Sequence, residues 1–143
     1  MSNITVREAN TADAAVLCRL NVAFNGDGLP GEEAIREALA RNPQEVTCVA
    51  ECDGRAVGFI CAQVQHSWCY ARPCMEITEL YVEEAYRRQG VGQKLMSLVE
   101  AIGAQRFGAD GFKLLTGRAN LTAQAFYESQ GYQKDNEVHY TKR

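Results

Sequence analysis

The chain has 143 residues, of which 46% are hydrophobic and 23% charged, as in a globular domain with a core of its own. Its formal net charge of −3 argues against a nucleic-acid-binding protein, because such proteins usually carry a basic surplus. No run approaches the roughly 18 apolar residues of a membrane span, and the N-terminus does not read as a signal peptide. We therefore expect one cytoplasmic domain, residues 1–143, with no nucleic-acid or membrane partner.

The first half of the chain predicts four strands and two helices. Residues 4–9 alternate apolar and polar side chains and predict a strand. A helix capped by Asn10 or Thr11 follows, then a glycine-rich break at 25–33 and a second helix over 32–41. Strands over 45–52 and 55–64 are joined by an Asp-Gly hairpin signal, and a β-rich run covers 74–82.

The second half begins with the clearest helix. Apolar residues recur at helical spacing from Val91 until Gly108 ends the run. A short strand at 112–116 precedes a helix that begins near Leu121 or Thr122, and residues 132–142 predict two final strands around a polar turn. Strands and helices in this order predict a single α/β domain with a mixed sheet.

Six cysteines raise the questions of disulfides and metal. Without a secretory signal, we expect reduced thiols, several of them buried as small apolar residues. Neither the Cys48/Cys52 nor the Cys69/Cys74 spacing is that of a zinc site, and only His66 and His139 could assist. We expect no metal and assign neither histidine a role.

The most informative local feature is the turn "RRQGVG", residues 87–92, between the 74–82 run and the long helix. Backbone N–H groups at a helix start attract anions, glycines let an anion approach, and guanidinium groups bind phosphate. The alternative is a structural turn whose arginines face solvent. A P-loop is excluded because Gln93-Lys94 follows Gly92, and the dinucleotide fingerprint lacks its third glycine.

The segments on either side of the turn help to decide between these two interpretations. "ITELYV" precedes it, and a long helix, a short strand and "NLTAQAFYESQGY" follow it. Together these resemble the GNAT superfamily of acyl-coenzyme A-dependent N-acyltransferases, whose Q/R-x-x-G-x-G/A motif is matched by Arg87, Gly90 and Gly92. The resemblance implies the GNAT fold, with about seven strands, about four helices and a sheet splayed between the fourth and fifth strands.

The resemblance also implies a site for acetyl-coenzyme A (acetyl-CoA) as co-substrate. Backbone N–H groups of the turn would bind the pyrophosphate, and the end of the preceding strand would pair with the pantetheine arm. The positions implied to bind the co-substrate are Leu80, Tyr81, Val82, Arg87, Arg88, Gln89, Gly90, Val91, Gly92 and Asn120.

Amide formation needs a base for the amine, an acid for the leaving thiolate and a donor for the oxyanion. Glu79 stands among apolar residues, where an unpaired carboxylate is costly, and family members often use a glutamate there as base, directly or through water. Glu76 is the alternative if a bulge shifts the register. Tyr127 matches the family's acid, although a core aromatic would fit its position, and the N–H of Leu80 or Val82 would serve the oxyanion. A cysteine nucleophile is the alternative chemistry, but none stands beside a histidine in sequence.

The acceptor is the least determined part. Acids in the glycine-rich break and the final hairpin favour a small cationic amine, such as a polyamine or an aminoglycoside-like molecule: Asp27, Glu32, Glu33, Asp135 and Glu137. Trp68 and Tyr70 would either line the acceptor pocket or pack on the core. A protein N-terminus or lysine is the alternative acceptor, and a non-catalytic acyl-CoA-binding module is the alternative function. Family habit favours a homodimer through the final strands, which no residue pattern fixes.

Overall fold

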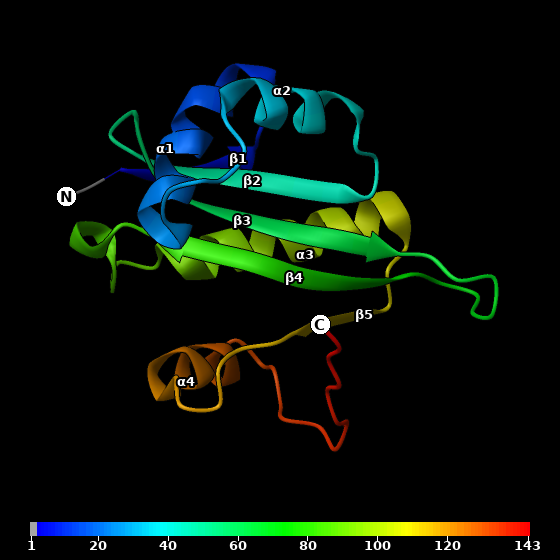
Figure 1. The fold of residues 1–143 in the computed structure, drawn as a ribbon. Helices are drawn as coiled ribbons and strands as arrows, with labels where there is room; N and C mark the ends of the chain where they lie inside the picture. The colour runs from blue at the N-terminus through cyan, green and yellow to red at the C-terminus, as the bar shows by residue number, and fades with distance from the viewer. Residues whose placement is uncertain (1–2) are drawn as a thin grey trace.

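The computed structural model describes residues 3–143 (Figure 1). Within them a five-stranded sheet has the order β1-β2-β3-β4-β5, in which β1 to β4 are antiparallel and β5 runs parallel to β4. The strands are β1 (Ile4–Glu8), β2 (Glu45–Cys52), β3 (Arg55–Gln65), β4 (Cys74–Val82) and β5 (Gly111–Leu114). The helices are α1 (Ala14–Asn25), α2 (Glu32–Arg41), α3 (Val91–Phe107) and α4 (Leu121–Ser129).

Helices cover both faces of the sheet. α1 and α2 pack on one face, where Leu17 and Leu20 contact Val49 and Phe59. α3 packs on the other face against a larger apolar cluster that includes Ile60 and Met75. Gly103 of α3 lets the helix approach closely, because a Cβ there would lie 2.3 Å from the Met75 sulfur. The mixed sheet and the four helices are those that the sequence predicts.

The prediction of about seven strands is wrong. Residues 132–143 form no strand in the structure, although they were expected to make the last two. From residue 133 onward every residue is exposed, including Val138 at 70% and Tyr140 at 86%. Alternating apolar residues stabilise a hairpin only when another layer covers one face, and no layer among residues 3–143 covers them.

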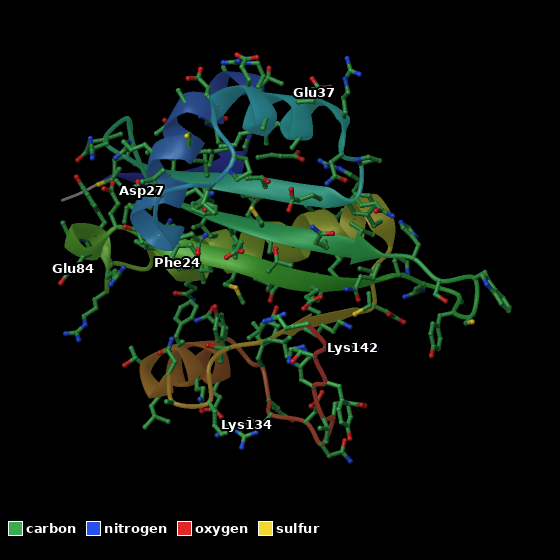
Figure 2. The ribbon with its side chains drawn as sticks, viewed as in Figure 1. Phe24, Asp27, Glu37, Glu84, Lys134 and Lys142 are labelled. Carbon is green, nitrogen blue, oxygen red and sulfur yellow. The ribbon has the colours of Figure 1, made fainter. Side chains whose placement is uncertain are left out.

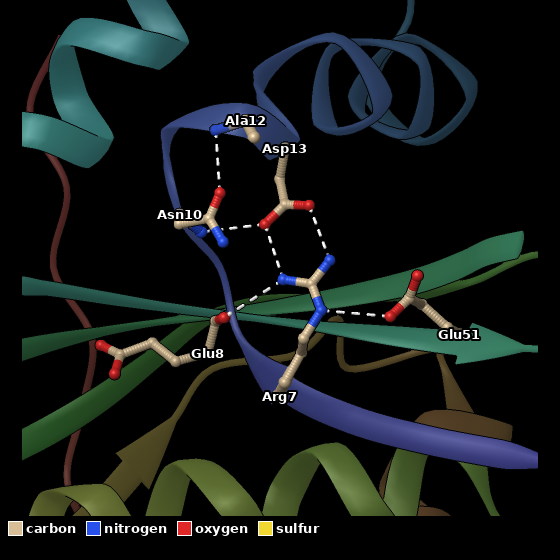
Figure 3. Close-up of polar contacts among 6 residues, drawn as sticks. All are labelled: Arg7, Glu8, Asn10, Ala12, Asp13 and Glu51. Carbon is tan, nitrogen blue, oxygen red and sulfur yellow. Dashed lines mark hydrogen bonds and ion pairs between the residues drawn. The ribbon is translucent and has the colours of Figure 1, made fainter. Parts of the chain in front are cut away.

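Charged side chains fix the start of α1 to the sheet (Figure 3). The Arg7 Nη1 and Nη2 atoms each donate to one oxygen of the Asp13 carboxylate at 2.8 Å, and the Arg7 Nε donates to Glu51 on β2 at 3.1 Å. The Asp13 carboxylate also accepts the Asn10 backbone N–H, while the Asn10 side chain accepts that of Ala12. This reciprocal cap confirms Asn10 as the residue that begins the helical segment.

Candidate functional site

The opening at the site comes from the unequal lengths of β4 and β5. Their pairing runs from Cys74 with Gly111 to Ile77 with Leu114, where β5 ends and β4 continues to Val82. Beyond Ile77 the side of β4 that faces away from β3 has no neighbouring strand within the described residues. We call this side, over residues 78–82, the open edge of β4. It lies where the sequence analysis expects the sheet to splay.

The register of β3 and β4 decides which backbone groups face the open edge. Leu80 lies opposite Ile60 and Val82 opposite Gly58, and the Glu83 N–H donates to the Val57 carbonyl. Hydrogen-bonded and non-bonded pairs alternate in an antiparallel ladder, so the N–H and C=O groups of Leu80 and Val82 point away from β3. The structure therefore turns both predicted oxyanion donors toward the open edge.

A bulge in β4 settles the direction of the two candidate bases. Glu79 lies opposite Cys61 and Ile77 opposite Ala62, which leaves Thr78 without a partner on β3. The extra residue places Glu76 and Glu79 on the same face of the sheet, the one that α1 and α2 partly cover. Glu76 accepts a hydrogen bond from Gln65 at 2.9 Å.

Burial and a nearby like charge determine the direction in which the pKa of Glu79 is shifted. Both the loss of water and the nearby Glu45 carboxylate raise the pKa of Glu79 above its ordinary value. Neither a hydrogen bond nor a cation opposes this rise in the described structure. Glu45 is a residue that the sequence analysis missed. It begins β2, and its alternation with Thr47 and Val49 along that strand could have placed it on the same face.

Tyr127 stands near Glu79. Burial raises the pKa of the Tyr127 hydroxyl, and the Glu79 carboxylate raises it further. The fold therefore brings Tyr127 of α4 within electrostatic reach of Glu79 on β4. Phe126 takes the packing role beside α3, as its ring lies against Gly92.

The glycine turn has the backbone of an anion site. Arg88 and Gly90 both have left-handed φ values, +63° and +83°, and α3 begins at Val91. No side chain caps this helix start, and the first N–H with an internal acceptor belongs to Lys94, which donates to the Gly90 carbonyl. Consecutive unmatched N–H groups in such a turn form a concave donor site.

The two motif residues that flank the turn have specific neighbours. A Cβ on Gly92 would lie 3.1 Å from the Phe126 ring, so this glycine also allows α4 to approach α3. The Arg87 Nε donates to the Val82 carbonyl at 2.7 Å, and its guanidinium lies 5.8 Å from the centre of the Tyr81 ring. Arg87 thus connects the turn to the open edge of β4. Asn120 caps α4 by accepting the Ala123 N–H at 3.1 Å.

An aromatic group lies on the α1 side of the same strand end. Phe24 lies near the end of α1 (Figure 2). Its ring stacks on Tyr81 with ring centres 5.1 Å apart, and Phe59 lies 6.3 Å from both rings. Phe24 remains 39% exposed, so part of its ring is available to a ligand. The sequence analysis did not identify Phe24, because its spacing within α1 resembles that of a core residue.

Several expected acceptor contacts are weakened by the structure. Arg36 forms ion pairs with both Glu32 and Glu33, so these acids are already neutralised within α2. Trp68 and Tyr70 lie in the loop between β3 and β4, next to the first residue of β4 and far along the strand from Val82, its last residue. Their side chains are 97% and 76% exposed. They therefore neither approach Glu79 nor pack on the core.

The cysteines and possible metal ligands lie apart from this arrangement. All six cysteines are free thiols. Burial raises the pKa of Cys61, the neighbour of Glu79 on β3, to about 12, which keeps its sulfur protonated. Among residues 3–143 no three histidine, cysteine, aspartate or glutamate side chains gather as a metal site. Over the same residues, no helix has the length and apolar character needed to cross a membrane.

Comparisons with known proteins agree with the geometry. The model of the acetyltransferase (GNAT) family matches residues 15–132. The uncharacterized N-acetyltransferase YhfO of Bacillus subtilis is 29% identical over 96% of this chain and 95% of its own length. An aminoglycoside N(6')-acetyltransferase type 1 of Stenotrophomonas maltophilia is 24% identical over 95% of this chain and 90% of its own.

A solved structure with a bound ligand shares the fold. Aminoglycoside N-acetyltransferase AAC(6')-Iy in complex with CoA superposes with a TM-score of 0.88 at 21% identity, covering 100% of this chain and 96% of that one.

Proposed function

The chain belongs to the acetyltransferase (GNAT) family and is an acetyl-CoA-dependent N-acetyltransferase, and we propose that it acetylates a primary amine of a small, cationic, aminoglycoside-like acceptor by direct transfer. One observation carries the mechanism. Glu79 lies on β4 at its open edge, Tyr127 of α4 lies within electrostatic reach of it, and burial and like charge raise the pKa values of both groups. Ionisable groups perturbed in this way are typical of acid–base sites.

On this proposal the co-substrate lies along the open edge of β4. The N–H groups at the start of α3 receive its pyrophosphate, and Arg87 and Arg88 contribute positive charge. The N–H groups of Leu80 and Val82 and the C=O group of Leu80 face this edge and would pair with the pantetheine amides, while the Val82 C=O already accepts from the Arg87 Nε. The thioester carbonyl oxygen accepts from one of these N–H groups as it gains negative charge.

The chemical step removes two protons from the acceptor nitrogen and adds one to the departing sulfur. Glu79, directly or through water, takes a proton from the acceptor ammonium, and its raised pKa makes it a stronger base than an ordinary carboxylate. The amine nitrogen forms a bond to the acetyl carbon, and the carbon–sulfur bond breaks. Tyr127 protonates the departing thiolate, since its raised pKa keeps the hydroxyl protonated at neutral pH. The nitrogen loses a second proton as the tetrahedral intermediate collapses to the amide, and this proton restores the Tyr127 hydroxyl directly or through water. The proton on Glu79 passes to solvent, so each acetyl transfer from thioester to ammonium releases one net proton.

The structure supports direct transfer over a cysteine acyl-enzyme. Cys61 is the cysteine that pairs with Glu79 across the strands, and its thiol has a pKa of about 12. A thiol of that pKa is almost entirely protonated near neutral pH and is a poor nucleophile. The amine itself is therefore the nucleophile in the proposed reaction.

Charge and aromatic surface support the acceptor class. Glu76, Glu79 and Glu45 share one face of the sheet, and Asp27 follows α1 near Phe24 (Figure 2). Carboxylates attract an acceptor with several ammonium groups, and the face of an aromatic ring accepts a cation or a sugar ring. Relatives named for aminoglycoside acetylation that match across most of both chains agree with this assignment.

A thiol-release assay with a panel of acceptors tests the proposal. The panel contains aminoglycosides, polyamines, and peptides with either a free N-terminus or a lysine, each at several concentrations with acetyl-CoA. We expect the highest kcat/KM with an aminoglycoside. A preference for peptides would replace the proposal with protein acetylation, and CoA binding without turnover on any acceptor would favour a non-catalytic module.

A further inference from the structure

The helix that carries Tyr127 has few contacts with the rest of the domain. Among the described residues, α4 contains no fully buried side chain. Its Phe126 ring lies against Gly92 at the start of α3. Phe126 and Tyr127 both pack against the apolar cluster beside α3, but apolar contacts are not directional and do not by themselves fix where a hydroxyl points. A second attachment is needed to fix the direction of the Tyr127 ring.

Tyr132 supplies the second attachment. The chain turns back after α4 at Gly131, whose φ is +93°, and the Tyr132 N–H donates to the Tyr127 carbonyl at 3.1 Å. The Tyr132 ring meets the Tyr127 ring at an angle of 63°, with centres 6.4 Å apart. Tyr132 therefore contacts both the backbone and the side chain of Tyr127.

The hydroxyl of Tyr132 connects this unit to α3. It donates to the Glu100 Oε2 at 2.6 Å, a length typical of a hydroxyl that donates to a carboxylate. Burial and the Glu100 carboxylate both raise the pKa of Tyr132, so the hydroxyl remains a donor through the neutral and alkaline range. Glu100 is half-buried on a helix whose core residues Val99 and Gly103 are fully packed, which makes it a rigid anchor.

We propose that the Tyr132–Glu100 hydrogen bond positions the Tyr127 hydroxyl for proton transfer. Tyr132 is a positioning residue, because it acts through Tyr127 and need not touch the reacting atoms. The inference rests on the proposed role of Tyr127 as the acid. A displacement of about 1 Å at a reacting group can cost up to about 100-fold in rate, so loss of this bond has a measurable effect.

The test is a double-mutant cycle on the rate of acetyl transfer. Tyr132→Phe removes only the hydroxyl and keeps the ring, so the contact with Tyr127 and the fold are retained. We expect kcat to fall about 10-fold in the otherwise unchanged enzyme and less than about 2-fold when Tyr127→Phe is already present. The KM for acetyl-CoA should not change, because the turn and the open edge of β4 are untouched.

Two substitutions of Glu100 provide the matched control. Glu100→Leu removes the acceptor and should reproduce the effect of Tyr132→Phe, whereas Glu100→Gln keeps a carbonyl oxygen for the hydroxyl and should retain most of the activity. Thermal melts of every variant confirm that the fold is present.

The outcomes separate the inference from the proposed function. An equal loss from Tyr132→Phe with and without Tyr127→Phe would overturn the positioning role and leave a structural one. If Tyr127→Phe alone has no effect on kcat, the proposed acid role fails, and the inference fails with it. A large effect of Tyr127→Phe together with no effect of Tyr132→Phe would overturn the inference alone.

Discussion

Around Arg7 every charge has a partner, whereas the carboxyl of Glu79 and the hydroxyl of Tyr127 have neighbours that exclude water without stabilising charge. Hydrogen bonds to Arg7 hold the pKa of Asp13 below its ordinary value. Burial and like charge instead hold the pKa values of Glu79 and Tyr127 above theirs.

The two groups of residues therefore serve different purposes. A paired carboxylate contributes to stability, because its charged form is favoured in the folded state. An unpaired, partly buried carboxylate costs stability and is retained where it performs chemistry. Substitutions at the first group should lower stability and leave activity unchanged, and substitutions at the second should lower activity without lowering stability.

The largest loss of function should come from the glycine turn, residues 87–92, which belongs neither to the Arg7 network nor to the proton-transfer pair. Gly90→Asp should weaken acetyl-CoA binding by on the order of 100-fold or more, measured by calorimetry, because a carboxylate would stand beside the N–H groups that receive the pyrophosphate. A Cβ at Gly90 meets no atom within 4 Å, so the effect arises from charge and from the φ of +83° rather than from a clash.

Two control substitutions separate the effect of the charge from the effect of the backbone strain. Gly90→Asn imposes the same backbone strain without the charge and should bind more tightly than Gly90→Asp. Gly108→Asp places the same side chain at the other end of α3, where φ is +67° and the space is also open, and should bind normally. Normal binding by Gly90→Asp would show that the turn is structural.

Tyr127→Phe should lower kcat by about 100-fold and change the KM for acetyl-CoA by less than about 2-fold, because the hydroxyl acts in the proton transfer. The melting temperature should not fall, since the ring that packs beside Phe126 remains. Tyr140→Phe, at an 86% exposed residue, is the matched control and should be silent in both measurements. A loss of stability without a loss of kcat would place Tyr127 with the structural group.

Glu79→Gln should lower kcat/KM by about 10- to 100-fold at neutral pH, with recovery at high pH, where more of the acceptor amine is already neutral. Glu76→Gln is the control on the same face, since Glu76 already binds Gln65. A pH–rate profile identical to that of the unchanged enzyme would remove Glu79 from the role of base.

At neutral pH, Glu79→Gln should raise the stability of the protein although it lowers the activity. Because the folded-state pKa of Glu79 is raised, its contribution to stability is complete below the unfolded pKa and is lost as pH rises through the folded value. Glu79→Gln should therefore match the unchanged protein in acid and be the more stable of the two at neutral pH, as urea denaturation at both pH values would measure.

Asp13→Asn should lower the free energy of unfolding by about 1–3 kcal/mol and leave kcat unchanged, because it removes charge-assisted hydrogen bonds at the start of α1. The folded-state pKa of Asp13 is lowered, so its contribution is present above the unfolded pKa and is lost as pH falls through the folded value. The difference between the two proteins should disappear in acid.

Glu37→Gln is the comparison for Asp13. It breaks an exposed pair with Arg41 within α2 and should cost less than about 0.5 kcal/mol (Figure 2). If Asp13→Asn proves as mild as Glu37→Gln, the network around Arg7 is not the stabilising element that its geometry indicates.

Local patterns were sufficient to predict most of the fold. The caps, glycines and apolar spacing that define α1 to α4 act within a few residues, and the family resemblance adds their order. The prediction of a final hairpin over residues 132–142 failed because the stability of a strand depends on partners that are distant in sequence. Val138 and Tyr140 alternate like strand residues, but both are largely exposed and no strand of the described structure includes them.

The sequence predicts a set of residues for the candidate site, which stays a prediction, but it does not predict the contacts that connect them. The motif identifies Arg87, but only the structure places its Nε on the Val82 carbonyl. Glu45 and Phe24 come from elements distant in sequence, and no local pattern associates them with Glu79 or Tyr81. Tyr132 stood within the quoted motif, yet its bond to Glu100 depends on how α4 meets α3.

The unpaired Thr78 changes which residues of β4 face α3. Before it, the odd-numbered Met75 and Ile77 face α3, and after it the even-numbered Leu80 and Val82 do. Both halves of the strand thus contribute to one core, while Glu76 and Glu79, which an unbroken strand would send to opposite faces, lie on the same side. A single unpaired residue allows one strand to carry a continuous core and two acids on the face opposite it.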